Sequence, residues 1–137
     1  RFRGIKCYNA FMEKMSEKKR FSIVARAKSF SHAFRGIGIL IKTQHNFWIQ
    51  LILAMLVIKL GVYFHISTTE WLFLVLAIGS VMIAEAFNTA FEIDINLTSP
   101  EYHPYARDTK DVAAGAVLLS TIMAIIIGLI IFLPKIF

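Results

Sequence analysis

Cysteine and proline are scarce in this chain, and these shortages limit the classes of protein to which it can belong. The 137 residues contain one cysteine, Cys7, so neither an intramolecular disulfide nor a cysteine-ligated metal cluster can form. Only three prolines are present, and two of them, Pro100 and Pro104, fall in one short polar stretch. A phosphate-binding glycine loop of the Gly-x-x-x-x-Gly-Lys type is absent. The sequence therefore argues against a disulfide scaffold and against a soluble phosphate-loop domain.

Long apolar runs dominate what is present. Hydrophobic residues make up 57% of the chain and the mean hydropathy is +0.63, above the level usual for a soluble domain. Three segments, 47–65, 71–91 and 112–134, reach the length of about 20 apolar residues that a bilayer span needs. The third carries no charge between Val112 and Pro134. We therefore predict a single all-α integral membrane domain, residues 21–137, with three transmembrane helices.

Positive charges are concentrated before the first span. Eleven of the 15 lysine and arginine residues precede Asn46, whereas the connection 65–70 has none. The positive-inside rule then places the N-terminus and the connection 93–111 in the cytoplasm. No cleavable signal peptide is expected, because the first long apolar run begins far from residue 1. Since the basic segment lies beside membrane spans, anionic lipid headgroups explain it better than nucleic acid, which we do not expect as a partner.

The basic N-terminal segment has two parts. Residues 1–20 are polar and basic without a clear apolar stripe, and are predicted to be a tail. In residues 21–42, apolar side chains recur at steps of three and four residues, as in Val24, Ala27, Phe30 and Phe34. This spacing predicts a basic amphipathic helix lying on the membrane surface. Farther along the chain, the two prolines in residues 96–105 predict a loop there.

The second span contains polar residues that are costly in a membrane. Glu85 lies deep in the apolar run, where a carboxylate costs several kcal/mol unless it is paired, neutralised or hydrated. Glu85, Asn88 and Glu92 are three and four residues apart, so they share one stripe of a helix. Their oxygens could gather a divalent cation or take a proton from a hydroxyl group. Glu92, near the end of the run, could merely join helices or reach the interface, but the depth of Glu85 favours a function.

Two motifs extend this stripe into a recognisable pattern. The first is Glu-x-x-Asn-Thr-Ala-x-Glu at 85–92, and the second is Lys-Asp-x-Ala-Ala-Gly-Ala-Val at 110–117, with Glu-Tyr-His at 101–103 between them. Over residues 21–134 the chain resembles the bacterial diacylglycerol kinase family of small membrane lipid kinases, which includes the undecaprenol kinases. The Asn-Thr-Ala and Ala-Ala-Gly segments look more like the undecaprenol kinase branch.

The resemblance implies an activity and an assembly. It implies a homotrimer in the bacterial cytoplasmic membrane, with active sites formed between protomers. The implied reaction is ATP- and Mg²⁺-dependent transfer of the γ-phosphoryl group to the hydroxyl of diacylglycerol or undecaprenol. Such a transfer needs mostly positioning and charge neutralisation.

The resemblance also assigns roles to residues by position. Glu85 matches the family's general base, with Asn88 as a polar residue of the active site. Glu92 matches a metal ligand, and Gln44 occupies the position of a second one. The residues that match nucleotide contacts are Arg26, Glu101, Tyr102, His103, Lys110 and Asp111.

Three departures from the family pattern leave alternatives open. Gln44 stands where relatives carry a metal-ligating Glu, Asn96 where they usually carry Asp, and Gln50 where they carry His or Glu. An amide oxygen can ligate magnesium but brings no charge. One alternative is therefore a catalytically weakened or non-catalytic relative of the same fold. Another is an ion or proton channel with Glu85 as a relay, although a channel would not need the motif at 101–103 or the Lys110-Asp111 pair.

Overall fold

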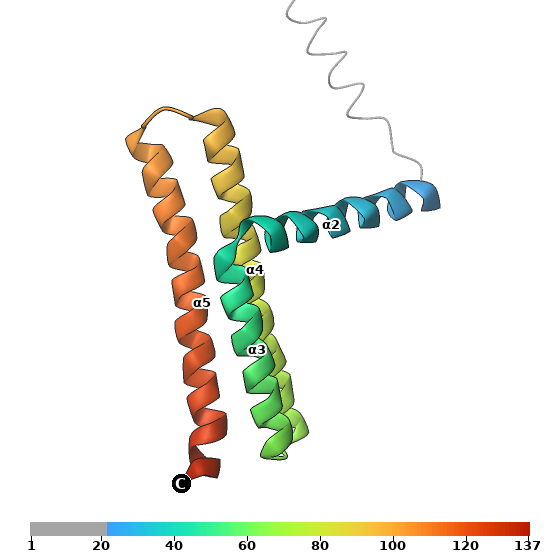
Figure 1. The fold of residues 1–137 in the computed structure, drawn as a ribbon, viewed down its shortest axis with the longest axis vertical. Helices are drawn as coiled ribbons and strands as arrows, with labels where there is room; N and C mark the ends of the chain where they lie inside the picture. The colour runs from blue at the N-terminus through green and yellow to red at the C-terminus, as the bar shows by residue number, and fades with distance from the viewer. Residues whose placement is uncertain (1–21) are drawn as a thin grey trace, which may run out of the picture. The chain divides into compact units, whose positions relative to one another are not determined.

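The computed structural model describes residues 22–137, and this part of the chain is helical without a strand. Four helices follow one another along the chain: α2 (Ile23–Thr43), α3 (His45–Tyr63), α4 (Thr68–Thr98) and α5 (Pro104–Ile136) (Figure 1). The predicted all-α class is confirmed. The predicted tail, 1–20, lies outside the described residues. The chain divides after Gly36 into two compact units, and each is described by itself.

The N-terminal unit is described from residue 22 and holds the first part of α2. Every side chain described in this part is exposed, including the large apolar Ile23, Phe30 and Phe34. The helix begins two residues after the predicted start and ends one residue after the predicted end. Exposed apolar side chains suit a helix on a membrane surface, and that location stays a prediction.

The second unit, residues 37–137, contains three helices that are long and apolar enough to cross a membrane. In Figure 1 the α3, α4 and α5 helices run lengthwise beside one another, and α4 packs most extensively against α5. Two of these helices extend beyond the predicted spans 71–91 and 112–134, and the limits of the spans in the membrane stay a prediction. The α4 helix continues seven residues beyond residue 91, and α5 starts eight residues before residue 112. The reason is that apolar length measures the membrane crossing, whereas polar residues can continue a helix beyond it.

The predicted loop at 96–105 is also wrong in extent. Only residues 99–103 connect α4 to α5. Pro104 opens α5, because the first turn of a helix does not use the amide hydrogen that proline lacks. At the other side, the hydroxyl of Thr98 donates to the carbonyl of Asp94 at 2.8 Å within the last turn of α4. Asn96 therefore belongs to a helix, one turn beyond Glu92.

The connection between α3 and α4 is a tight turn with both helix ends capped. His65 has a positive φ of 49°, and the Ile66 amide donates to the Gly61 carbonyl at 3.1 Å, which is the Schellman pattern of a helix end. Ser67 and Glu70 then form a capping box at the start of α4. The turn satisfies backbone groups that the two helices would otherwise leave unpaired.

Apolar packing and one ion pair close the bundle at this turn. The buried cluster joins residues of the turn and of α4 to the last turns of α5, and it comprises Ile66, Leu74, Ile131 and Phe132. Lys135 near the end of α5 pairs with Glu70 at 3.0 Å. This end of the bundle holds α4 and α5 in register, and the polar stripe lies toward the other end of α4.

Candidate functional site

Glu85 is the most deeply buried large side chain among the described residues, with 2% of its surface exposed. Its carboxylate Oε2 accepts a hydrogen bond from Gln50 Nε2 on α3 at 3.0 Å. One turn later, the Thr89 hydroxyl donates to the backbone carbonyl of Glu85 at 2.9 Å. Among the described residues, the hydrogen-bond partner of the carboxylate is therefore a neutral amide and not a cation.

Glu92 lies two turns farther along α4, between two side-chain amides. Gln44 Nε2 donates to Glu92 Oε2 at 3.3 Å, and Asn88 Nδ2 donates to Glu92 Oε1 at 3.3 Å. Gln44 precedes the first residue of α3, where its backbone is extended. The other polar side-chain atom of Asn88, Oδ1, is buried and has no hydrogen-bond partner within residues 22–137. A carboxylate flanked by amides is thus assembled from residues far apart in the sequence.

The donor atoms in this cluster suit a hard divalent cation. Glu92 supplies a carboxylate, Asn88 an unpartnered amide oxygen, and Gln44 a second amide. Magnesium prefers oxygen ligands and is often held by one or two carboxylates together with substrate phosphates. Within residues 22–137, no three His, Cys, Asp or Glu side chains gather around one point. The cluster therefore fits an ion shared with a phosphate group and does not form an all-protein cage.

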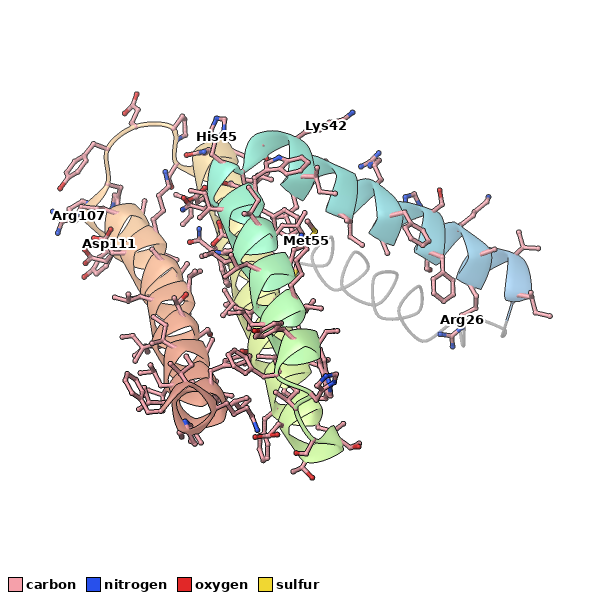
Figure 2. All side chains as sticks on the ribbon, turned by 60° about the horizontal axis from the view of Figure 1, so that its bottom comes forward. Arg26, Lys42, His45, Met55, Arg107 and Asp111 are labelled. Atoms are coloured by element: carbon pink, nitrogen blue, oxygen red, sulfur yellow. The ribbon has the colours of Figure 1, made fainter. Side chains whose placement is uncertain are left out.

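Lys110 links the two helices near the connection 99–103. Its Nζ donates to Asn96 Oδ1 at 2.7 Å, across from α5 to α4. Asp111 instead approaches Arg107, with 3.9 Å between its Oδ2 and the arginine Nε (Figure 2). Arg107 also pairs with Asp108 at 3.2 Å. Among the described residues Lys110 binds a neutral oxygen and forms no ion pair with a carboxylate, so its positive charge is available to bind a phosphate.

The predicted site residues of the connection 99–103 have no hydrogen bond or ion pair to this cluster within the described residues. Glu101, Tyr102 and His103 lie in the connection 99–103 and are exposed. The ring of His103 lies 5.6 Å from that of Tyr105. Arg26 belongs to the N-terminal unit. The structure therefore brings Gln44, Asn88 and Glu92 together directly, and it leaves the residues of the connection open to an external partner.

Gln50 and Asn96 are the residues that the predicted site lacked. Both are departures from the family pattern, but the sequence predicts no contact for either. Gln50 binds the carboxylate of Glu85, and Asn96 binds Lys110. A signal for Gln50 was present, because a polar side chain inside an apolar span usually faces the interior of the helical bundle and pairs there.

Comparisons with known proteins identify the family of this chain. The sequence profile described as "Prokaryotic diacylglycerol kinase" matches residues 31–132. An undecaprenol kinase of Bacillus subtilis is 42% identical over 108 residues, covering 79% of this chain and 88% of the relative. A diacylglycerol kinase of Synechocystis is 39% identical over 107 residues, covering 77% of this chain and 61% of the relative. One from Helicobacter pylori is 28% identical over 109 residues, covering 74% and 85%.

The profile extends from α2 to the last turns of α5, so it includes the stripe on α4, the connection 99–103 and the Lys110-Asp111 pair. Both the shared sequence and the buried carboxylate in a membrane helix therefore support one assignment. The chain belongs to the prokaryotic diacylglycerol kinase family and is a membrane lipid kinase.

Proposed function

We propose that this chain transfers the γ-phosphoryl group of ATP to the hydroxyl of a membrane lipid alcohol, either diacylglycerol or undecaprenol. The observation that carries the proposal is Glu85, a carboxylate with 2% exposure inside a helix long enough to span a membrane. A carboxylate buried in a membrane helix lowers stability, so we expect it to have a function. Relatives named undecaprenol kinase and diacylglycerol kinase support both substrates.

In this proposal Glu85 acts as the general base. Its carboxylate accepts the proton of the lipid hydroxyl while the hydroxyl oxygen forms the new bond to the γ-phosphorus of ATP. The bond from that phosphorus to the β–γ bridging oxygen breaks, and ADP leaves with the electron pair. Gln50 holds the carboxylate by a hydrogen bond of 3.0 Å, which fixes the direction in which the oxygens face. Burial of Glu85 keeps water, a competing acceptor of the phosphoryl group, away from the base. Asn88, one turn along the same stripe, orients groups beside the reacting centre.

Glu92, Gln44 and Asn88 would hold Mg²⁺ in the proposed site. When bound, the ion supplies positive charge that neutralises phosphate oxygens during the transfer. Lys110, held by Asn96 at 2.7 Å, contributes a fixed positive charge toward the same phosphates. The proposed contacts to the nucleotide are completed by Arg26, Glu101, Tyr102, His103 and Asp111.

We further propose a homotrimer in the bacterial inner membrane, with its nucleotide sites in the cytoplasm. Exposure of Glu101, Tyr102 and His103 supports a site completed by a neighbouring protomer. The basic residues before Asn46 support the orientation. A Ser99→Cys variant made in a Cys7→Ser background tests it in intact cells. An impermeant thiol reagent added outside should leave the variant unlabelled, and labelling would contradict the orientation.

The activity itself is tested with purified protein in mixed micelles containing ATP, Mg²⁺ and one lipid alcohol at a time. We expect phosphorylation of at least one of the two lipids. The absence of transfer to both would favour the alternative of a non-catalytic relative. That alternative draws on the neutral residues Gln44 and Asn96, which leave Glu92 as the charged member of its cluster.

A further inference from the structure

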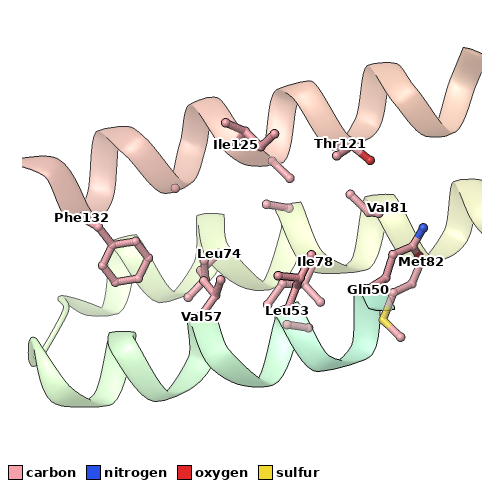
Figure 3. A pocket seen from close by; sticks show the side chains of 14 residues that line it. Gln50, Leu53, Val57, Leu74, Ile78, Val81, Met82, Thr121, Ile125 and Phe132 are labelled. Carbon is pink, nitrogen blue, oxygen red and sulfur yellow. The ribbon is translucent and has the colours of Figure 1, made fainter. Parts of the chain in front are cut away.

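A cavity of about 290 Å³ lies between α3, α4 and α5 (Figure 3). Its walls are almost entirely apolar and contain leucine, isoleucine, valine and alanine side chains of all three helices. Gln50, Met82 and Thr121 lie at one end of the cavity, and Phe132 lies at the other (Figure 3). The cavity thus runs along the bundle and starts beside Gln50, the residue that binds the carboxylate of Glu85.

Gln50 and Thr121 are the two polar residues that line this cavity. The Thr121 hydroxyl donates to the carbonyl of Val117 at 2.9 Å, so its hydrogen is already used. Gln50 donates its Nε2 to Glu85, and its Oε1 is buried with no hydrogen-bond partner among the described residues. Because an unpaired buried acceptor costs about 1–3 kcal/mol, a ligand hydroxyl that reached this oxygen after a rotation of the amide would be stabilised.

We propose that this cavity binds the first part of a single apolar chain of the lipid alcohol, with the hydroxyl end at Gln50 and Glu85. The inference rests on the proposed lipid kinase function and specifies the substrate class, an alcohol with one chain, such as a polyprenol. The hydroxyl then lies beside Gln50, whose amide binds the carboxylate that later takes its proton.

The size of the cavity supports a single chain. Its volume of about 290 Å³ is at the lower limit of the roughly 300–1,000 Å³ found for small-molecule pockets. Along α5 its lining runs from Thr121 to Phe132, which corresponds to roughly 16 Å at the rise of about 1.5 Å per residue in a helix. This is about half of the ~30 Å hydrocarbon core of a bilayer. The cavity therefore has the depth of one leaflet and little room for a second chain.

Gly128 offers a way to fill the cavity without disturbing the helices. A Cβ atom placed there meets no atom within 4 Å, and Gly128 lines the cavity. Leucine also favours a helix more than glycine does. Gly79 on α4 is a matched control, because a Cβ there likewise meets no atom within 4 Å and the residue lies outside the cavity lining.

The experiment compares wild type, Gly128→Leu and Gly79→Leu with undecaprenol, diacylglycerol and the short alcohol prenol. We expect Gly128→Leu to lower kcat/KM for undecaprenol about tenfold or more, since small changes in an apolar pocket have effects of that size. The undecaprenol-to-diacylglycerol ratio should fall with it. Activity with prenol, the KM for ATP and the Gly79→Leu variant should stay near wild type.

Four results would overturn the inference. Unchanged kinetics for Gly128→Leu would show that no chain occupies the cavity, and an equal loss with undecaprenol and prenol would show a general defect. A loss of oligomer in Gly128→Leu, seen by size-exclusion chromatography, would assign the cavity to a helix of a second copy. A selective loss of undecaprenol activity in Ala116→Leu instead would place the chain in the larger cavity of about 500 Å³ that Asn88 lines.

These results are distinguishable from a failure of the proposed function. If wild-type protein phosphorylates neither undecaprenol nor diacylglycerol, the lipid kinase proposal fails for this chain. If wild type is active and Gly128→Leu matches it with every alcohol, only the chain-binding inference fails.

Discussion

The two ends of the three-helix unit are built on opposite principles. At the turn end, residues 61–74 and 131–135, a capping box, an ion pair and an apolar cluster satisfy and cover the groups that meet there. At the polar end, residues 44–50 and 85–96, two carboxylates have amide partners, and Gln50 Oε1 and Asn88 Oδ1 are buried without a partner among the described residues. Unpaired buried polar atoms cost stability. One end is therefore closed by satisfied contacts, whereas the other keeps buried polar atoms that a ligand could pair.

Glu85→Gln should have the largest effect, and it tests the role of the polar end. The substitution keeps the size of the side chain and removes its ability to accept a proton, so phosphoryl transfer should fall by about 10²–10⁴-fold. The fold should persist, because an amide can still pair with Gln50. Turnover at saturating lipid and the helical circular dichroism signal measure the two effects. Turnover near that of wild type would remove Glu85 from the role of base.

Gly61→Val should damage the turn end and spare the polar end. A Cβ atom at Gly61 would lie 2.9 Å from the Trp71 ring and 3.0 Å from Ile66 Cδ1, closer than packed atoms tolerate. Overpacking of this kind typically costs about 1–3 kcal/mol, so the apparent Tm should fall. Gly79→Val is the control, since its Cβ meets no atom within 4 Å. Equal Tm values for the two variants would mean that the turn end is not closely packed.

Gln44→Glu should strengthen Mg²⁺ binding at the polar end without a large change in stability. Gln44 Nε2 lies 3.3 Å from Glu92 Oε2, so the substitution places a second carboxylate beside Glu92. Because ligand charge helps to set divalent-ion affinity, the Mg²⁺ concentration for half-maximal activity should fall roughly tenfold. His45→Glu adds the same charge one residue away, at an exposed position, and should have a smaller effect. Superimposable Mg²⁺ titrations of wild type and Gln44→Glu would separate Gln44 from metal binding.

Lys135→Gln should have the smallest effect of the four. The Lys135–Glu70 pair is 3.0 Å long and about a quarter exposed at each side chain, and such pairs contribute about 0–1 kcal/mol. The apparent Tm should therefore fall by a few degrees at most, with activity unchanged. Glu70→Gln should cost more, because Glu70 also completes the capping box with Ser67. A loss of turnover in Lys135→Gln would show that the two ends are not independent.

The helices and the stripe on α4 could be predicted because they depend on local sequence. In a bilayer the backbone must satisfy its own hydrogen bonds, so long apolar runs form helices. The three spans were found by this rule, although their ends were not, since hydropathy stops where polar residues begin. The spacing of Glu85, Asn88 and Glu92 likewise follows from helical geometry alone.

What only the tertiary structure decided is which distant residues face one another. Gln44 meets Glu92 across 48 residues, Gln50 meets Glu85 across 35, and Lys110 reaches back to Asn96. The sequence marks each of these residues as polar in an apolar setting but gives no rotation or depth for one helix against another. Those quantities come from the packing of side chains along whole helices, and the cavity beside Gln50 exists only as a consequence of that packing. Local periodicity therefore determined the helices and the polar stripe on α4, and the partners of the stripe were decided by how the helices pack.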